Sequence, residues 1–77
     1  MTQQTYLNGY YLKYEDSETG INYGLDYLRY KLQPAESLVF FNQARATGQA
    51  QFEDDYDRQF TLMYNNDGTF TLLKRDY

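Results

Sequence analysis

Carboxylates, lysines and tyrosines are the only side chains in this sequence that remain for acid and base chemistry. The 77 residues include ten tyrosines and eleven acidic residues, but no histidine and no cysteine. The usual nucleophile–histidine pairs and thiolate metal sites are therefore excluded. A glycosidase-type carboxylate pair would need a deep cleft, for which so small a chain has little volume. We expect no enzymatic activity, no cofactor and no metal site.

The densest group of carboxylates is the segment EDDYD at residues 53–57. Its spacing matches no EF-hand loop, which places oxygen ligands at fixed positions. One interpretation is a solvated loop between strands. The other is an acidic patch, with Asp54, Asp55 and Asp57, that binds a basic protein surface by imitating a phosphate array. The protein would then be an acidic inhibitor, or DNA mimic, that occupies a nucleic-acid-binding site on a target protein.

Tyrosine is concentrated near the start of the chain, where seven of the ten lie between residues 6 and 32. Tyrosine favours protein interfaces, because its ring contributes area at low rotamer cost and its hydroxyl tolerates a wet rim. The alternative is that these rings fill a small core with their hydroxyls at its edge. The candidate partner-binding tyrosines are Tyr10, Tyr11, Tyr14, Tyr23 and Tyr30.

The charge balance weighs against nucleic acid and membrane as partners. A net charge of −4 opposes nonspecific attraction to phosphate backbones and to anionic membranes. Only Lys13, Arg29 and Lys31 accompany the clustered tyrosines, too few for a groove that follows a nucleic-acid backbone. No stretch approaches the length of a membrane span, and the start MTQQTYLNGYY lacks the pattern of a signal peptide. The expected location is the cytoplasm.

The first 32 residues show apolar side chains that alternate with period two. This pattern predicts strands at Thr5–Tyr14 and Ile21–Leu32, joined by the charged run EDSETG. In the resulting hairpin Tyr14 lies opposite Ile21, and one face is almost continuously apolar. At the base of the hairpin both faces become apolar, so something should cover each side.

The segment QPAESLVFFNQARATG predicts the one helix of the chain. Pro34 suits its first position, Glu36 the positive first turn and Gly48 its end. The stripe that should pack on the sheet contains Ser37, Phe41, Ala44 and Gly48.

The remaining residues predict a short strand at AQFE and a hairpin in which Phe60–Tyr64 and Phe70–Leu72 flank the turn NNDG. The order β-β-α-(β)-β-β favours an α+β fold, a small antiparallel sheet of four or five strands with one helix packed on a face. Residues 1–77 should form a single domain.

One helix covers one sheet face, whereas the first hairpin shows apolar side chains on two. Our leading hypothesis is therefore a small non-enzymatic interaction or regulatory module. It would bind another protein, or a second copy of itself as a homodimer, through a tyrosine-rich sheet surface. The acidic inhibitor is the alternative.

Overall fold

The computed structural model describes residues 1–75, which form one five-stranded sheet and two helical segments. In chain order the elements are β1 (Thr2–Leu7), β2 (Tyr10–Glu15), α1 (Ile21–Asp26), the π-helix η1 (Tyr27–Lys31), α2 (Pro34–Thr47), β3 (Gln49–Glu53), β4 (Gln59–Tyr64) and β5 (Phe70–Arg75). The predicted α+β class is confirmed. No helix within residues 1–75 is long and apolar enough to cross a bilayer.

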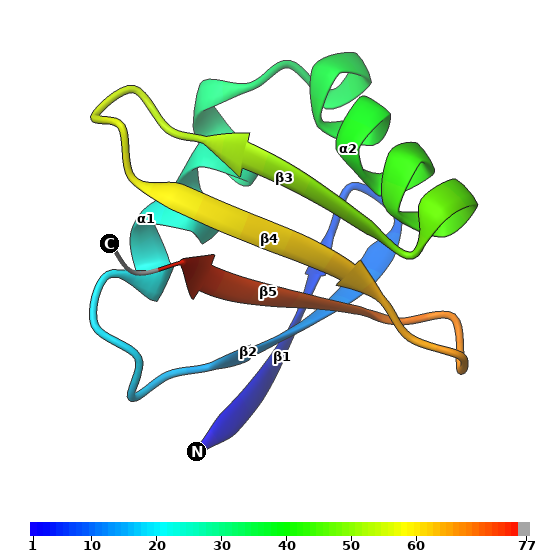
Figure 1. Cartoon of the computed structure of the whole chain (residues 1–77), viewed down its shortest axis with the longest axis horizontal. Helices are drawn as coiled ribbons and strands as arrows, with labels where there is room; N and C mark the ends of the chain where they lie inside the picture. The colour runs from blue at the N-terminus through cyan, green and yellow to red at the C-terminus, as the bar shows by residue number, and fades with distance from the viewer. Residues whose placement is uncertain (76–77) are drawn as a thin grey trace.

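The strands lie in the order β1-β2-β5-β4-β3 (Figure 1). All neighbours are antiparallel except β2 and β5, which run parallel with Leu12 opposite Phe70 and Tyr14 opposite Leu72. The prediction of a wholly antiparallel sheet is wrong in this one pairing. After β2 the chain passes through the helices and returns through β3 and β4, so that β5 reaches the free edge of β2 in the same direction.

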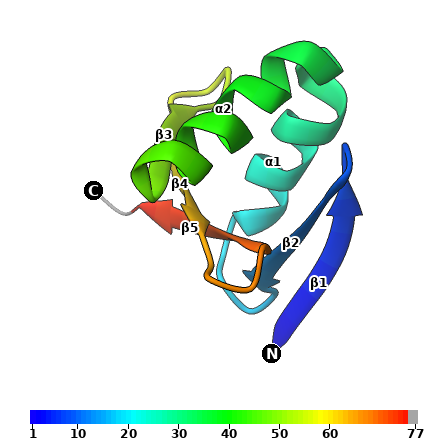
Figure 2. The ribbon, with the colours of Figure 1, turned by 90° about the vertical axis from the view of Figure 1, so that its right-hand side faces the viewer.

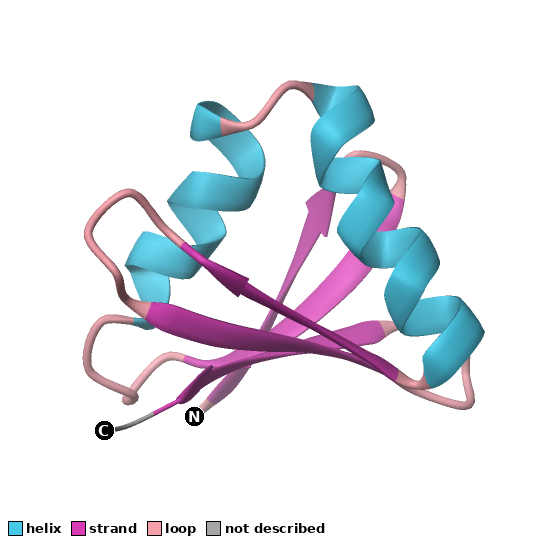
Figure 3. Ribbon diagram, turned by 45° about the horizontal axis from the view of Figure 1, so that its top comes forward, coloured by secondary structure: helices cyan, strands magenta, loops and turns pink. Residues whose placement is uncertain are grey.

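Both helical segments lie on the same face of the sheet (Figures 2 and 3). The prediction of one helix is therefore wrong in number. Between the helices and the sheet lies one core of buried apolar residues, which are Leu7, Leu12, Ile21, Leu25, Leu28, Phe41, Ala44, Ala50, Phe52, Phe60, Leu62, Phe70 and Leu72.

The first hairpin is shorter than predicted and turns earlier. Asn8 and Gly9 have φ angles of 50° and 93°, so the predicted strand Thr5–Tyr14 divides into β1 and β2. Tyr14 lies opposite Gln3 instead of Ile21. Asn-Gly is a favoured pair for a two-residue hairpin turn, because both central residues need positive φ. This local signal decides the register.

The predicted strand Ile21–Leu32 is helical instead, forming α1 and η1. Ile21, Gly24, Leu25 and Leu28 are buried, a spacing of i, i+3, i+4 and i+7 that belongs to a helix. The alternating tyrosines between them produced the competing strand pattern. Helical geometry lets Gly24 approach the sheet, where a Cβ atom at that position would lie 2.7 Å from the ring of Phe60.

The second helix, α2, agrees with its prediction. Pro34 is its first residue, and Glu36 accepts a hydrogen bond from the backbone N–H of Gln33 at 2.9 Å. Gly48 follows the helix with a φ of 97°, a conformation that favours glycine. Ser37, Phe41 and Ala44 are buried against the sheet, as the stripe predicted, whereas Gly48 is exposed.

The C-terminal half forms the predicted meander. β3 pairs with β4, and β4 pairs with β5 around a tight turn in which the Asn65 N–H donates to the Thr69 carbonyl at 2.8 Å. The Asp67 carboxylate accepts hydrogen bonds from the backbone and side chain of Thr69, and Gly68 has a φ of 87°. The predicted turn at NNDG is therefore confirmed, and its Asn, Asp and Gly residues form it.

Candidate protein-binding surfaces

The predicted site residues fall into four different places. Tyr10 and Tyr14 lie on the face of the sheet that the helices cover, and Tyr11 lies on the opposite face. Tyr23 belongs to α1 and Tyr30 to η1. The three aspartates lie in the segment between β3 and β4. The structure therefore does not bring the eight predicted residues together on one surface.

Tyr10 and Tyr14 pack against the core and are half-buried. The ring of Tyr10 stacks on Phe41 with centroids 4.7 Å apart, and its edge meets Phe70 at 5.2 Å. Such aromatic pairs stabilise a core beyond the area that they bury. The contacts of Tyr10 and Tyr14 therefore support the alternative prediction, in which tyrosine rings fill the core with their hydroxyls at its edge.

The second face of the sheet, which we call the open face, is covered by no helix within residues 1–75 (Figure 3). Side chains alternate across a strand, so the register assigns every second residue to this face. Its side chains are Thr2, Gln4, Tyr6, Tyr11, Lys13, Glu15, Gln49, Gln51, Glu53, Gln59, Thr61, Met63, Thr71, Leu73 and Arg75.

An aromatic pair marks the β1–β2 end of the open face. Tyr6 and Tyr11 lie directly opposite each other, with ring centroids 5.1 Å apart in an edge-to-face arrangement. Their side chains remain 60% and 50% exposed, respectively. Met63 and Leu73 add exposed apolar surface on β4 and β5. Tyr6 is not among the predicted binding residues. The predicted uninterrupted strand places it on the same side as Tyr10 and Tyr14, whereas the turn at Asn8 and Gly9 places it beside Tyr11.

Charges on the open face balance each other. Lys13 and Arg75 are matched by Glu15 and Glu53, so the net charge of −4 arises from the rest of the molecule. Arg75 donates to the side chain of Gln51 at 3.0 Å, a bridge that passes over β4, where Thr61 is buried. The face is therefore neutral, mixed in polarity and aromatic at one end.

A pocket of about 160 Å³ lies between the α1–η1 segment and the segment after β3. Its lining residues are Tyr23, Asp26, Tyr27, Lys31, Asp54, Asp55, Tyr56 and Arg58. The guanidinium of Arg58 lies 3.6 Å from the ring centroid of Tyr23 and 5.0 Å from that of Tyr56. Three of the predicted residues, Tyr23, Asp54 and Asp55, thus meet at one pocket.

Asp54 organises the loop between β3 and β4. Its carboxylate accepts hydrogen bonds from the backbone N–H groups of Tyr56 and Arg58, both at 2.9 Å, and from Nε of Arg58 at 2.5 Å. Burial tends to raise the pKa of Asp54, but the hydrogen bonds from Arg58 and Tyr56 outweigh it and hold the pKa below its usual value. A carboxylate held in this way is a structural element of the loop.

The other predicted residues near this loop and on the helices are exposed. Asp55 and Asp57 face solvent, and Asp57 has a φ of 64°. Tyr30 is 72% exposed, with the Arg29 guanidinium 5.9 Å from its ring centroid. Across residues 1–75, no three acidic side chains gather as a ligand set for a metal ion.

Tyr27 forms the inner wall of the pocket. Its ring stacks on Phe52 with centroids 5.9 Å apart. Burial, together with the nearby carboxylates of Asp55, Glu36 and Asp54, raises the pKa of the Tyr27 phenol above its usual value.

Comparison with known protein families, curated proteins and solved structures found no match to this chain.

Proposed function

We propose that this chain is a small non-enzymatic protein-binding domain of the cytoplasm that engages its partner with the open face of the sheet. The observation that carries the proposal is the exposed Tyr6–Tyr11 pair on a five-stranded sheet whose helices all lie on the other side. Exposed aromatic side chains with polar neighbours are typical of protein interfaces.

The charge of the open face favours a protein partner over nucleic acid. Binding to a phosphate backbone draws on several unpaired cations, whereas Lys13 and Arg75 are balanced by two carboxylates on the same face. Threonine and glutamine side chains supply hydrogen-bond donors and acceptors without net charge. The partner that fits this face is therefore a neutral protein surface with apolar side chains where it meets the Tyr6–Tyr11 end.

Site-specific crosslinking would test this proposal. A photoreactive amino acid would replace Tyr11 in one variant and Val39 in the control variant. Val39 is 61% exposed, but it lies on α2 and not on the open face. We expect a partner protein from the source cell to crosslink at position 11 only. Equal capture at both positions, or capture at 39 alone, would contradict binding by the open face.

The alternative proposal is an acidic inhibitor that binds a basic target through the loop between β3 and β4. The exposed carboxylates of Asp55 and Asp57 support it, whereas that of Asp54 is engaged by Arg58. The double variant Asp55→Asn/Asp57→Asn would lose the captured partner if this alternative holds. The variant Tyr6→Ser/Tyr11→Ser would lose it if the open face binds.

A further inference from the structure

The outer edge of β1 has none of the features that usually prevent edge strands from pairing. Residues 2–7 read TQQTYL, without charge, proline or glycine, and all six pair with β2 on one side. Protected edges commonly carry a charged residue, a proline or a bulge. The opposite edge strand, β3, ends with Glu53. The β1 edge is thus open to a further strand.

The hairpin geometry shows which backbone groups of β1 face outward. Leu7 and Tyr10 flank a two-residue turn, a position at which the pair exchanges both backbone hydrogen bonds. Hydrogen-bonded pairs recur at every second residue, and at the start of β1 the Asp16 N–H donates to the Met1 carbonyl at 3.1 Å. The backbone N–H and C=O groups of Thr2, Gln4 and Tyr6 therefore point away from β2.

We propose that β1 pairs antiparallel with β1 of a second copy of this chain, with the two-fold axis at Gln4. Gln4 then lies opposite Gln4, and Thr2 opposite Tyr6, so that all three outward-facing residues form backbone hydrogen bonds in both copies. A shift by one residue would leave these groups out of phase, and a shift by two would leave at least one of the three residues without a partner. The register centred on Gln4 is therefore the one that uses every outward-facing group.

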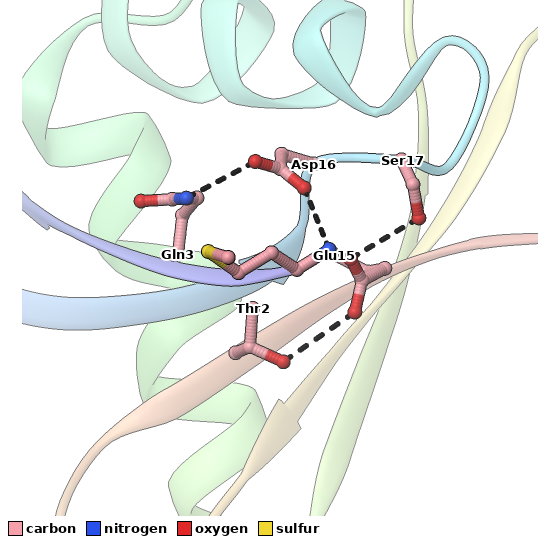
Figure 4. A network of polar contacts seen from close by, with 6 residues as sticks. Thr2, Gln3, Glu15, Asp16 and Ser17 are labelled. Atoms are coloured by element: carbon pink, nitrogen blue, oxygen red, sulfur yellow. Dashed lines mark hydrogen bonds and ion pairs between the residues drawn. The ribbon is translucent and has the colours of Figure 1, made fainter.

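Charges beside the edge are complementary in this register. Nη2 of Arg29 donates to the Thr5 hydroxyl at 2.7 Å, and Nε2 of Gln3 donates to the Asp16 carboxylate at 3.0 Å (Figure 4 shows the contacts of Asp16). Asp16 also accepts a hydrogen bond from the Met1 ammonium at 2.9 Å within its own chain. Because Thr5 lies opposite Gln3 of the second copy, Arg29 would add a second cation beside Asp16 of that copy. The two-fold axis creates this contact twice. The self-pairing strand thus matches charge as well as backbone.

The paired sheets would present their open faces on the same side. A two-fold axis that relates antiparallel neighbours in one sheet is perpendicular to the sheet, so the helices of both copies remain together on the other side. This inference concerns the edge of the sheet and does not depend on what the open face binds. The variant Tyr11→Ser should remain a dimer even though it removes the aromatic pair of the proposed binding face.

A charge-swap experiment would test the interface between copies. Sedimentation equilibrium at micromolar concentration should show a dimer for the native chain. The variants Arg29→Glu and Asp16→Arg place like charges in both contacts, so each alone should dissociate about tenfold more readily. In an equimolar mixture, a dimer of one Arg29→Glu chain with one Asp16→Arg chain has opposite charges at both contacts. This mixed dimer should approach native affinity.

Backbone pairing would be tested separately at Gln4. Gln4→Pro removes an outward N–H that β2 does not use, and proline is tolerated at such an edge position. We expect this variant to be monomeric with an intact circular dichroism spectrum, whereas Gln4→Ala should remain dimeric. A native chain that stays monomeric, a mixture no tighter than its components, or a dimeric Gln4→Pro variant would each overturn the proposal.

Discussion

Among single residues, Asp54 shows how a carboxylate that looked available for binding is used by the fold. Three hydrogen bonds converge on it, two from the backbone of its own loop and one from Arg58. Arg58 in turn lies over the ring of Tyr23, so the loop is joined to α1 through one side chain. Asp54, which the sequence predicts as a binding residue, therefore stabilises the loop that lines the pocket.

Replacing Asp54 by asparagine should destabilise the protein by about 1–3 kcal/mol at neutral pH, since buried hydrogen bonds to an ionised group are lost. The effect should depend on pH. The pKa of Asp54 is lowered in the folded state, so its stabilisation is present above the unfolded pKa of about 3.9 and is lost as the pH falls through the folded pKa. Urea unfolding of both proteins at several pH values would measure this.

Asp55→Asn is the matched control, because Asp55 is an exposed carboxylate in the same loop. Its unfolding free energy should stay close to that of the native protein at neutral pH. A difference between native protein and Asp54→Asn that is unchanged down to strongly acidic pH would contradict the structural role of the ionised carboxylate.

Two hydroxyl groups on α2 should respond in opposite directions when removed. The Ser37 hydroxyl is fully buried without a hydrogen-bond partner among residues 1–75, so Ser37→Ala should stabilise the protein by about 1 kcal/mol. The Thr47 hydroxyl bonds the carbonyls of Gln43 and Gln49, so Thr47→Ala should destabilise it slightly. Thermal unfolding of both variants would check the signs. A lower melting temperature for Ser37→Ala would show that its hydroxyl has a partner.

At the scale of elements, the position of α1 depends on the missing side chain of Gly24. A Cβ atom there would approach Phe60 and Leu72 to 2.7 and 3.1 Å. Gly24→Ala should therefore destabilise the protein by about 1–2 kcal/mol, because overpacking of about 1–3 kcal/mol exceeds the helix-propensity gain of up to about 1 kcal/mol. Denaturant unfolding would measure the change.

The exposed residue Asn22 in the same helix supplies the control. Asn22→Ala gains helix propensity without a new contact and should be neutral or slightly stabilising. If the two substitutions changed stability equally, the close approach of α1 to the sheet would not be what limits the side chain at position 24.

Elements with a strong local signal were predictable from the sequence. α2, β3 and the β4–β5 hairpin follow from capping residues, alternation and the NNDG turn. The prediction of a strand at Ile21–Leu32 is wrong, because exposed or half-buried tyrosines alternate there with the buried residues Ile21, Leu25 and Leu28. A half-polar ring suits either environment, so its placement in the pattern does not distinguish the two periods.

The candidate surfaces were less predictable than the elements. Tyr6 joins Tyr11 only when the hairpin turns at Asn8, and Arg58 meets Tyr23 only through the tertiary fold. The parallel pairing of β2 with β5 likewise has no local signature, since it depends on how the whole chain crosses the sheet. Local sequence patterns do not show which residues far apart in the chain come together, so these contacts were not predicted.

At the scale of the molecule, β5 joins two parts that do not otherwise share a strand. It lies between β2 and β4, with the first hairpin on one side and the β3–β4 pair on the other (Figure 1). A chain ending at Gly68 should therefore lose cooperative unfolding, because both parts would expose core residues. A peptide of residues 69–77 should restore the near-ultraviolet circular dichroism signal. Cooperative unfolding of the shortened chain alone would contradict this dependence on β5.

The central place of β5 also sets when the domain is able to fold during its own synthesis. The first hairpin and the helices leave the ribosome early and Leu12 pairs with Thr5 at once, but its neighbour on the other side arrives only when Phe70 has emerged. Until then the edge of β2 that pairs with β5 has no strand beside it. Newly made chains on one messenger would therefore be most prone to mispair at the β2 edge of their N-terminal hairpins, and their protection depends on prompt arrival of the C-terminal strand.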